Sequence, residues 1–418
     1  MVRIVDASAV SAMLRRRAGR MTEAEGLVRP ILDAVRTKGD KALVEYARKF
    51  DGLDAATVAV PQAALDAAFA GLSKQMKAAL KQASANIRAY AKLQLPVAKQ
   101  AMLAPGLKTG QVIRPLDVVA AYIPSGRYPL PSTLMMTAIP AQVAGVEVVC
   151  ACSPKPAEAV MGTASYLKVN RFFRMGGAHA IAAFAYGTKT VPRADRIVGP
   201  GNIYVAAAKK LLAGEVGIDF VAGPTEILII AHEKASEANP KWIAADMLAQ
   251  AEHDTDASAI VLTKSKQLAA AVAKEVERQL ATLPTAAVAR KAIERNSAII
   301  VVSSQAEAVE ISNRFAPEHL SIPDRSLLAG IRHAGSIFIG PVSTEAAGDY
   351  ASGPNHVLPT SGVARLRGGL STADYVKVIS TQELSLSALK KLEASVTTLA
   401  RAEGLEAHAR SVEVRTRG

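Results

Sequence analysis

The sequence predicts an α/β protein with two blocks of parallel strands and helices, and three observations lead to this fold class. Stretches rich in β-branched residues alternate with stretches of helical period in two parts of the chain, 112–212 and 227–340, which is the pattern of βαβ units. Half of the residues are hydrophobic and only 4% are aromatic, which favours a helix-rich α/β protein over an all-β one. At 418 residues the chain is too long for one core, so two or three domains are expected.

The region before the first block is expected to be helical. Residues 23–95 have mostly helical period and few strand signals, and Pro61 suits the first turn of a helix. β-Branched residues then gather from Val112 to Ile123, and a loop at 122–126 leads into a helix from about Ser132.

The first block continues with alternating strands and helices. We expect strands at 146–152, 172–175 and 196–198, and helices at 157–167, after Gly176-Gly177, and at 203–212. In the second block we expect strands at 227–231, 259–262, 298–302 and 336–340, and helices at 240–252, 265–294 and up to Phe315. Past Gly348 the chain is loop-rich and closes with a helix whose apolar stripe is Leu389, Leu392, Val396 and Leu399, ended by Gly404.

Charge and composition exclude several classes of protein. The formal charge is +13, from 50 Lys and Arg against 37 Asp and Glu, and the basic residues are spread out except for Arg15-Arg16-Arg17. Without a recognition helix or zinc-finger spacing, this charge indicates an anionic ligand such as a dinucleotide and no nucleic-acid partner. Residues 128–146 lack charge but contain three prolines, so a buried helix is expected there and no membrane span.

The compartment is predicted to be the cytoplasm. The first residues have no apolar stretch of a secretory signal. The two cysteines, Cys150 and Cys152, alternate along one predicted strand, so they would face the same side and pack as small apolar groups.

The stretch Phe315-Ala316-Pro317-Glu318-His319-Leu320 places a carboxylate beside an imidazole. Pro317 disfavours a helical Ala316, so the preceding helix would end here and leave Glu318 and His319 at the edge of an element, where catalytic groups are frequent. A solvated surface pair is the alternative.

Four further clusters could bind ligands. Gly199-Pro200-Gly201-Asn202 and Gly176-Gly177 stand at strand-to-helix junctions, where backbone N–H groups can approach a phosphate, although such loops are also plain tight turns. Gln250 and His253 share one helix face and could share a metal or cap the helix end. Two other segments hold histidines close to acidic residues: 348–356, with Asp349 and His356, and 403–408, with Glu403 and His408.

Five motifs resemble those of the histidinol dehydrogenase family, in the same order along nearly the whole chain. They are AGPTE (222–226), AQAEHD (249–254), RFAPEHL (314–320), GDYASGPNHVLPTSG (348–362) and GPGN (199–202). The resemblance implies a zinc-dependent homodimer that oxidises L-histidinol to L-histidine in two steps through bound histidinaldehyde, with two molecules of NAD and one Zn²⁺ per subunit.

The resemblance also implies roles for individual residues. The catalytic pair would be Glu318 and His319, and the dinucleotide contacts Tyr122, His179 and Asn202. The zinc ligands would be Gln250, His253, Asp349 and His408, with the last supplied by the other subunit. The substrate would be bound by Thr225, His319, His356 and Glu403 together with these four ligands.

The family pattern implies a division of the chain as well. Two Rossmann-like, incomplete parallel-sheet domains are expected: residues 26–115 plus 226–365, with most metal and catalytic residues, and residues 116–225, with the dinucleotide contacts. Residues 1–25 would form an N-terminal helical arm, and residues 366–418 a C-terminal helical tail that reaches the partner subunit.

Three departures from the family pattern leave the substrate open. His179 stands where many members have Gln, Thr225 where many have Ser, and Ser125 where Gly is frequent. The first two keep a hydrogen-bonding group. Some relatives oxidise other hydroxylated molecules, including a sulfonated propanediol, so such a substrate is the alternative. A second alternative is that the chain is a non-catalytic binding protein with the same fold.

The residue types suit a two-step oxidation of an alcohol to an acid. Each step needs a base with a pKa near neutrality, which an imidazole provides, so we expect His319 to act in both oxidations and Glu318 to activate the water that hydrates the aldehyde. Zinc has no redox role and would orient or polarise the substrate, and ligands without a thiolate suit a catalytic site.

Overall fold

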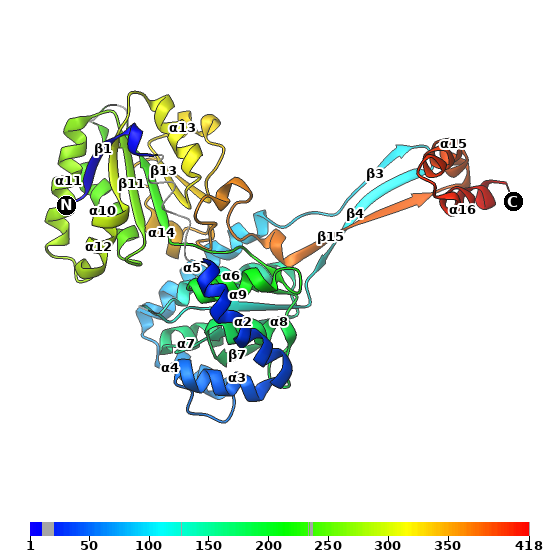
Figure 1. Cartoon of the computed structure of the whole chain (residues 1–418), viewed down its shortest axis with the longest axis horizontal. Coiled ribbons are helices and arrows are strands. Elements are labelled where there is room, and N and C mark those ends of the chain that lie inside the picture. Colours follow the sequence, from blue (N-terminus) through cyan, green and yellow to red (C-terminus); the bar gives the residue numbers. More distant parts are fainter. Residues whose placement is uncertain (11–20, 127, 233, 235–236, 418) are drawn as a thin grey trace.

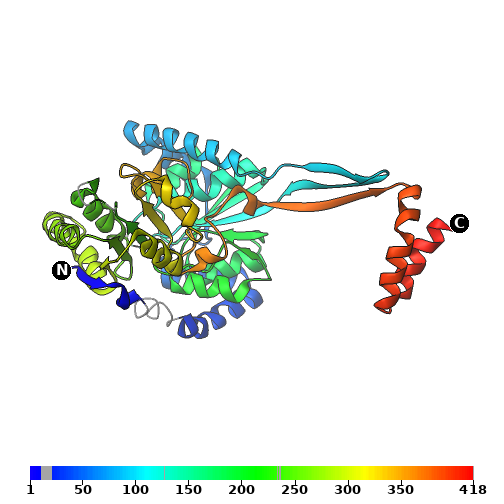
Figure 2. The same cartoon turned by 90° about the horizontal axis from the view of Figure 1, so that it is seen from above.

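The structure, a computed structural model, describes residues 1–417 except 11–20, 127, 233 and 235–236. Two α/β lobes lie next to each other, and a long arm projects away from both (Figures 1 and 2). The basic run at 15–17 lies outside the described residues.

The first lobe is a six-stranded parallel sheet in the order β1-β12-β11-β10-β13-β14. Helices α10 (Pro240–Ala251), α11 (Lys266–Leu280) and α12 (Ala286–Asn296) cover one face, and α13 (Gln305–Phe315) covers the other. Alternate residues of each strand enter the two cores: Ile227 and Ile229 of β10 face one, and Leu228 faces the other. The strands span Arg3–Asp6 (β1), Glu226–Ile230 (β10), Ser258–Thr263 (β11), Ala298–Val301 (β12), His319–Ile322 (β13) and Ser336–Ile339 (β14), and the short helix α14 spans Glu345–Tyr350.

The second lobe is a six-stranded sheet in the order β2-β7-β6-β5-β8-β9, parallel except for β2, which is antiparallel to β7. One face carries α5, α6 and α7, and the other carries α2, α3, α8 and α9. The strands span Ala59–Val60 (β2), Val118–Tyr122 (β5), Val148–Ser153 (β6), Arg171–Arg174 (β7), Arg196–Val198 (β8) and Gly217–Ile218 (β9). The helices span Met21–Lys38 (α2), Asp40–Tyr46 (α3), Gln62–Gly71 (α4), Lys74–Leu93 (α5), Pro131–Ala144 (α6), Glu158–Tyr166 (α7), Gly177–Tyr186 (α8) and Ile203–Leu212 (α9).

The arm is an antiparallel sheet that ends in two helices. Its strands β3 (Lys99–Ala104), β4 (Leu107–Pro115) and β15 (Val376–Leu384) pair in the order β15-β4-β3. Helices α15 (Leu386–Ala402) and α16 (Glu406–Thr416) form a hairpin at its far end, well away from both lobes (Figures 1 and 2). Single turns of 3-10 or π helix lie at Ala7–Ala9, Ala47–Asp51, Arg325–Gly330, Val363–Arg365 and Thr372–Tyr375.

The α/β class, the two blocks of parallel strands and a helix that ends just before Gly404 are confirmed. That helix is not the last one as predicted, because α16 follows it. The strands β1, β3, β13 and β15 were not predicted. The expected division of the chain also differs from the observed packing. Residues 3–6 lie in the first sheet and not in an N-terminal arm, and β2 and the helices from α2 to α5 belong to the second lobe and not to the first. The tail is not helical throughout, because β15 precedes its helices.

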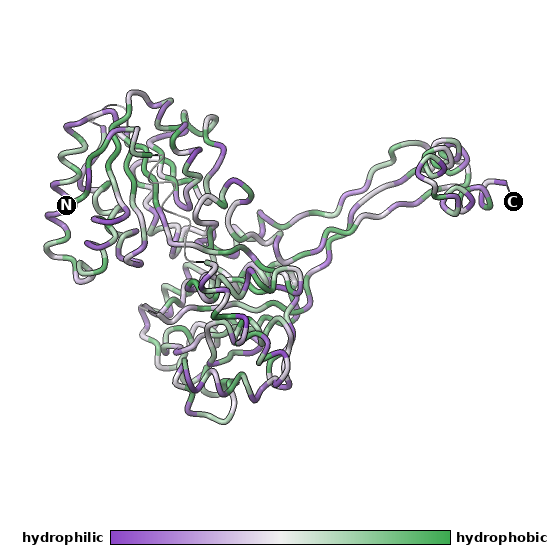
Figure 3. Tube along the Cα trace, in the orientation of Figure 1, coloured by the Kyte–Doolittle hydropathy of each residue, from purple (hydrophilic) through white to green (hydrophobic). Residues whose placement is uncertain are grey.

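Two expectations about burial are confirmed. Cys150 and Cys152 are free, buried and on the same side of β6. The uncharged stretch at 128–146 forms α6, whose residues 132–141 are all buried. Hydrophobic segments are concentrated in the strands and inner helices of both lobes (Figure 3), and within the described ranges no helix has the length and hydrophobicity needed to cross a bilayer.

Candidate active site

Residues predicted to be catalytic or to bind the substrate lie at the amino ends of two neighbouring strands of the first lobe. His319 is the first residue of β13 and pairs in register with Ile227 of β10, and Thr225 directly precedes β10. Open parallel sheets usually bind ligands at the opposite, carboxyl ends of their strands. Helix α10 runs back across the sheet, so Gln250, near its end, reaches the same edge, where its amide donates to Thr225 Oγ1 (2.8 Å).

The Glu318–His319 segment is buried, so the surface-pair alternative is wrong. Glu318 is 6% exposed and His319 3% exposed. Helix α13 ends at Phe315 as predicted, but Ala316 adopts a left-handed conformation (φ 48°, ψ 62°), where an extended one was expected before Pro317. The left-handed residue ends the helix and lets its N–H bond to Ser312 O (2.8 Å), after which the chain enters β13.

Glu318 is held by two donors from the neighbouring strand. Its Oε2 accepts hydrogen bonds from the Thr225 hydroxyl (2.5 Å) and from the Glu226 backbone N–H (2.9 Å). Burial raises the pKa of Glu318 to about 7, although His319 and these two donors act in the opposite direction. A carboxylate with this pKa can take up and release a proton near neutral pH.

The imidazole of His319 presents one nitrogen to the site. Its Nδ1 lies 3.2 Å from the Glu226 carbonyl oxygen, which can only accept, so the neutral ring carries its proton on Nδ1. Nε2 is buried, has no hydrogen-bond partner in the described part of the chain, and lies 3.5 Å from Asp349 Oδ1. Burial alone would lower the pKa of His319, but the charges of Glu345, Glu318 and Asp349 outweigh it and raise that pKa well above its usual value.

The donor set beside His319 fits a divalent cation. One ligand atom each from His253, Glu345 and Asp349 lies within 4.8 Å of the other two. Gln250 is fully buried and its Oε1 has no partner among the described residues. Burial raises the pKa of Glu345 to about 8, and the charges of Asp349 and Glu318 act in the same direction. Two of the four predicted ligands, His253 and Asp349, thus lie in one group of ligand atoms, and a third, Gln250, is linked to Glu318 through Thr225.

His356 links this site to the second lobe. Its Nδ1 is 2.7 Å from the Asp349 backbone oxygen and its Nε2 is 3.0 Å from Thr133 Oγ1 of α6. The amide of Asn355 donates to Met136 O (2.6 Å) on the same helix. The loop from Asp349 to His356 therefore lies between the two lobes.

Two predicted site residues are not brought to this site within one chain. Glu403 is the C-cap of α15 and His408 lies in α16. Both are exposed, and both lie at the far end of the arm (Figure 2). Within a single chain they therefore cannot join Gln250, His253 and Asp349.

The three predicted dinucleotide residues lie around loops of the second lobe. Tyr122 ends β5, and its hydroxyl accepts from the Gly177 N–H (3.2 Å). His179 is 1% exposed, and its Nε2 lies 2.8 Å from Asp51 Oδ2, which also accepts from the Gly176 N–H. Asn202 is exposed and caps α9, because its Oδ1 accepts from the backbone N–H groups of residues 204 and 205. Four backbone donors at these helix ends, the N–H groups of residues 176, 177, 204 and 205, are therefore used within the chain.

A buried ion pair holds the loop that contains Asn202. Lys209 Nζ donates to Asp219 Oδ1 and to Gly199 O, both at 2.6 Å, and Asp219 Oδ2 accepts from the Gly199 N–H (2.8 Å). Gly199 has φ +108°, and a Cβ there would lie 2.2 Å from Tyr122 O. Only glycine fits this contact.

Sequence reasoning missed Glu345, Asp51 and Thr133. Glu345 precedes Asp349 by four residues on α14, and this spacing places two carboxylates on one helix face, so the sequence did contain a signal for it. No comparable signal marks Asp51 or Thr133, which meet their partners only in the folded chain.

Comparisons with known proteins show the family to which the chain belongs. The family model described as histidinol dehydrogenase matches residues 14–416. A protein named histidinol dehydrogenase from Methanothermobacter thermautotrophicus is 44% identical, covering 98% of this chain and 97% of its own. One of the same name from Halalkalibacterium halodurans is 46% identical over 94% and 93%. The crystal structure of histidinol dehydrogenase from Elizabethkingia anophelis superposes with a TM-score of 0.94 at 34% identity, covering 100% of this chain and 98% of that one. The chain is an oxidoreductase and belongs to the histidinol dehydrogenase family.

Proposed function

We propose that this protein is a zinc-requiring, NAD-dependent enzyme that oxidises L-histidinol to L-histidine through a bound aldehyde, at the end of histidine biosynthesis in the cytoplasm. One observation carries the proposal: the buried His319 Nε2 lies 3.5 Å from Asp349 Oδ1, and Asp349 forms a group of possible metal ligands with His253 and Glu345. Gln250, linked to Glu318 through Thr225, has a buried Oε1 without a hydrogen-bond partner in the described ranges. Relatives named histidinol dehydrogenase at 44–46% identity favour histidinol over a sulfonated diol.

His319 is the proposed base of the alcohol oxidation. With its Nδ1 proton held by the Glu226 carbonyl, Nε2 can accept the proton of the substrate hydroxyl when the ring is neutral. A cation bound by the neighbouring carboxylates would favour the neutral ring, because it would offset the negative charges that raise the pKa of His319. General base catalysis of this kind contributes about 10²–10⁴-fold to rates. Bound NAD would accept a hydride in each of the two oxidations, and bound zinc would hold and polarise the substrate.

Glu318 is the proposed base for the water that hydrates the aldehyde. Its Oε2 already accepts from Thr225 and from the Glu226 N–H, which leaves Oε1 to take a proton from water. His319 would then take the hydroxyl proton of the hydrate during the second oxidation. The division of roles follows from position, since His319 Nε2 points toward Asp349 whereas Glu318 is anchored to β10.

The residues that would hold the zinc are Gln250, His253 and Asp349, with His408 of a second subunit as the fourth. Glu345 is a further candidate, because it lies within the same group of ligand atoms. The substrate would contact these residues together with Thr225, His319, His356 and Glu403. Tyr122, His179 and Asn202 would line the dinucleotide site, with Tyr122 and His179 fixing its loops through the contacts described above.

A homodimer would complete the site. The arm exposes many large apolar side chains, and such surfaces mark protein contacts. They are Val97, Met102, Leu103, Val378, Ile379, Leu384, Leu386, Leu399, Leu405 and Val414. A partner subunit that covers this arm would bring Glu403 and His408 to the first lobe of the other chain.

A substrate screen tests the function. Purified enzyme with Zn²⁺ and NAD is mixed with L-histidinol or with a sulfonated propanediol, and NADH is followed by absorbance. We expect NADH from histidinol, two per substrate, and its loss after chelation and return with added Zn²⁺. NADH only from the diol would overturn the choice of substrate. Ligand binding with no NADH from either substrate would indicate a binding protein.

A further inference from the structure

The two arm residues that would complete the partner's site lie on either side of a single turn. Glu403 ends α15, Gly404 takes a left-handed conformation (φ +76°), and α16 begins at Glu406, so His408 is in its first turn. The angle between the two helices therefore sets how Glu403 and His408 are placed relative to each other and to the arm.

The hairpin has too small a core to fix this angle by packing. Its buried apolar side chains in the described structure are all alanines: Ala388, Ala400 and Ala409. Among the larger apolar side chains, Leu389, Leu392, Val396 and Val412 are only partly buried, and Leu399, Leu405 and Val414 are 44–68% exposed. This packing removes a limited apolar surface from water, so a polar interaction between α15 and α16 can add to it.

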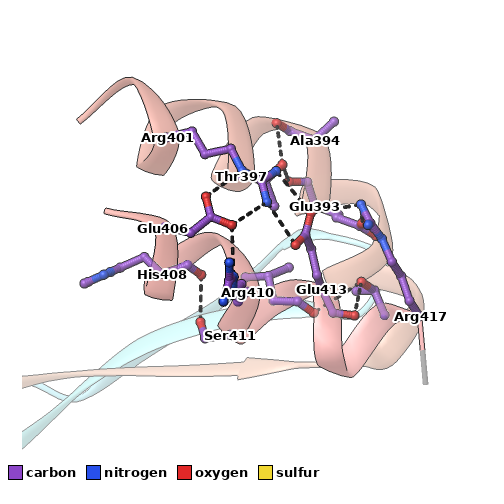
Figure 4. A network of polar contacts seen from close by, with 12 residues as sticks. Glu393, Ala394, Thr397, Arg401, Glu406, His408, Arg410, Ser411, Glu413 and Arg417 are labelled. Carbon is purple, nitrogen blue, oxygen red and sulfur yellow. Dashed lines mark hydrogen bonds and ion pairs between the residues drawn. The ribbon is translucent and has the colours of Figure 1, made fainter. Parts of the chain in front are cut away.

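Arg401 provides that interaction. Its guanidinium makes two bonds to Glu406 (Nε to Oε2, 2.9 Å, and Nη2 to Oε1, 3.0 Å). It makes two more to Glu413 (Nη1 to Oε1 and Nη2 to Oε2, both 3.1 Å). The two carboxylates are seven residues apart on α16, so one side chain of α15 holds two turns of its neighbour (Figure 4).

The other ion pairs of the hairpin are less suited to this role. Arg410 also donates to Glu406 (3.1 Å), but both residues belong to α16. Arg417 joins Glu393 of α15 to Glu413 (2.9 and 3.0 Å), but at the far end of the hairpin from the turn. Isolated surface pairs contribute little to stability, whereas bidentate arginine pairs in a network are the exception. Arg401 is the bridging residue next to Glu403 and His408.

The side chain of His408 is free to reach another subunit. Figure 4 shows its ring directed away from the network of ion pairs. The only hydrogen bond shown for this residue in the figure uses its backbone oxygen, which accepts from the Ser411 hydroxyl (2.8 Å). The four bonds of Arg401 to Glu406 and Glu413, called the clamp below, thus fix the backbone that carries His408 without using its imidazole.

We propose that Arg401 is a positioning residue for the active site of the partner subunit: by clamping Glu406 and Glu413 it holds α16 at the angle that delivers His408 to the metal. The proposal rests on the shared, zinc-binding site of the proposed function. Ligand geometry must hold to within about 0.5 Å for tight binding, and without the clamp α16 can rotate about the Gly404 turn.

The first test measures metal binding in Arg401→Met. We expect a dimer of unchanged mass and a Zn²⁺ affinity that is lower by about tenfold or more, as for other residues that orient metal ligands, with activity restored by excess Zn²⁺. Arg401→Lys should be intermediate, because one ammonium cannot hold two carboxylates bidentately. Arg410→Met is the matched control, since it loses a bond to Glu406 without releasing α16 from α15, and it should retain Zn²⁺ as the wild type does. Zn²⁺ affinity in Arg401→Met equal to that of the control would overturn the proposal.

The second test asks whether Arg401 acts on the other subunit. Arg401→Met chains are mixed and reassembled with His253→Ala chains, which have an intact arm but a disabled metal site. In the mixed dimer, the intact first lobe of the Arg401→Met chain would receive an intact arm, so one site per dimer should bind Zn²⁺ with wild-type affinity. If mixing leaves the affinity as weak as in Arg401→Met alone, Arg401 acts within its own chain and the proposal is wrong.

A parallel mixture separates this outcome from a failure of the proposed function. His253→Ala and His408→Ala chains, each inactive alone, should regain one working site when mixed. Recovery here without recovery in the Arg401→Met mixture would overturn the clamp alone. No recovery in either mixture would overturn the shared site and the clamp with it.

Discussion

In the first lobe, the candidate active site contains three buried polar atoms without partners in the described structure, Gln250 Oε1, His319 Nε2 and Glu345 Oε2. In the second lobe, each of the three predicted dinucleotide residues has a partner within the chain. Leaving a buried polar atom without a hydrogen-bond partner costs about 1–3 kcal/mol. A ligand that pairs with these atoms would therefore stabilise the first lobe. The second lobe also has two such atoms, Ser153 Oγ and Arg196 Nε, but neither belongs to a predicted dinucleotide residue. The difference between the two sets of predicted residues supports the proposal that the bond-making chemistry takes place in the first lobe.

The largest effect is expected from His319→Asn. Asparagine can keep a hydrogen bond to the Glu226 carbonyl but offers no base in place of Nε2, so turnover should fall by about 10²–10⁴-fold. NADH formation from histidinol and from the aldehyde measures both oxidations, and Zn²⁺ content is the control for an intact site. Substantial activity in the variant would place the base elsewhere.

A smaller and selective effect is expected from Glu318→Gln. The amide cannot accept a proton from water, so oxidation of supplied aldehyde should slow by about 10²-fold, with the alcohol step less affected. The pKa of Glu318 also predicts how the rate of the aldehyde step depends on pH. Because burial raises the pKa of Glu318 to about 7, the acid is mostly protonated at pH 6, so the aldehyde step should speed up as pH rises through about 7. The variant should lose this rise. Equal slowing of both steps would contradict the division of roles.

The third expectation concerns the identity of the metal ligands. Glu345 lies within the group of ligand atoms but is also 3.6 Å from His319 Nδ1. If Glu345 orients the metal ligands without coordinating Zn²⁺ itself, Glu345→Gln should weaken Zn²⁺ binding by about 10–100-fold. The number of Zn²⁺ ions bound per subunit should stay unchanged. Titration of chelated protein with Zn²⁺ measures both, and Glu310→Gln on the surface of α13 is a control. Unchanged affinity would mean that Glu345 acts on His319 alone.

Sequence reasoning predicted more of the fold than of its long-range contacts. Strand β8 and helix α9 have the predicted bounds. The strand ends where Gly199-Pro200-Gly201 begins, and Asn202 caps the helix that follows. It missed β13, because this strand is only four residues long. It also missed β3 and β15, which are stabilised by pairing with β4 and not by burial. The burial of Glu318 and the contact between Glu345 and His319 depend on strand order, which no local pattern encodes.

The smallest effect is expected from His179→Gln in the second lobe. His179 Nε2 and the Gly176 N–H share Asp51 Oδ2 in a buried position, and an amide can donate to the same oxygen. The KM for NAD should therefore change by less than about fivefold, with kcat unchanged, because the glutamine amide keeps a hydrogen bond to the same carboxylate oxygen. His179→Leu removes one partner of Asp51 and should lower stability by about 1–3 kcal/mol, which thermal unfolding measures. If His179→Gln lowered kcat as strongly as the first-lobe variants do, the second lobe would take part in the chemistry, and the distinction between the lobes would fail.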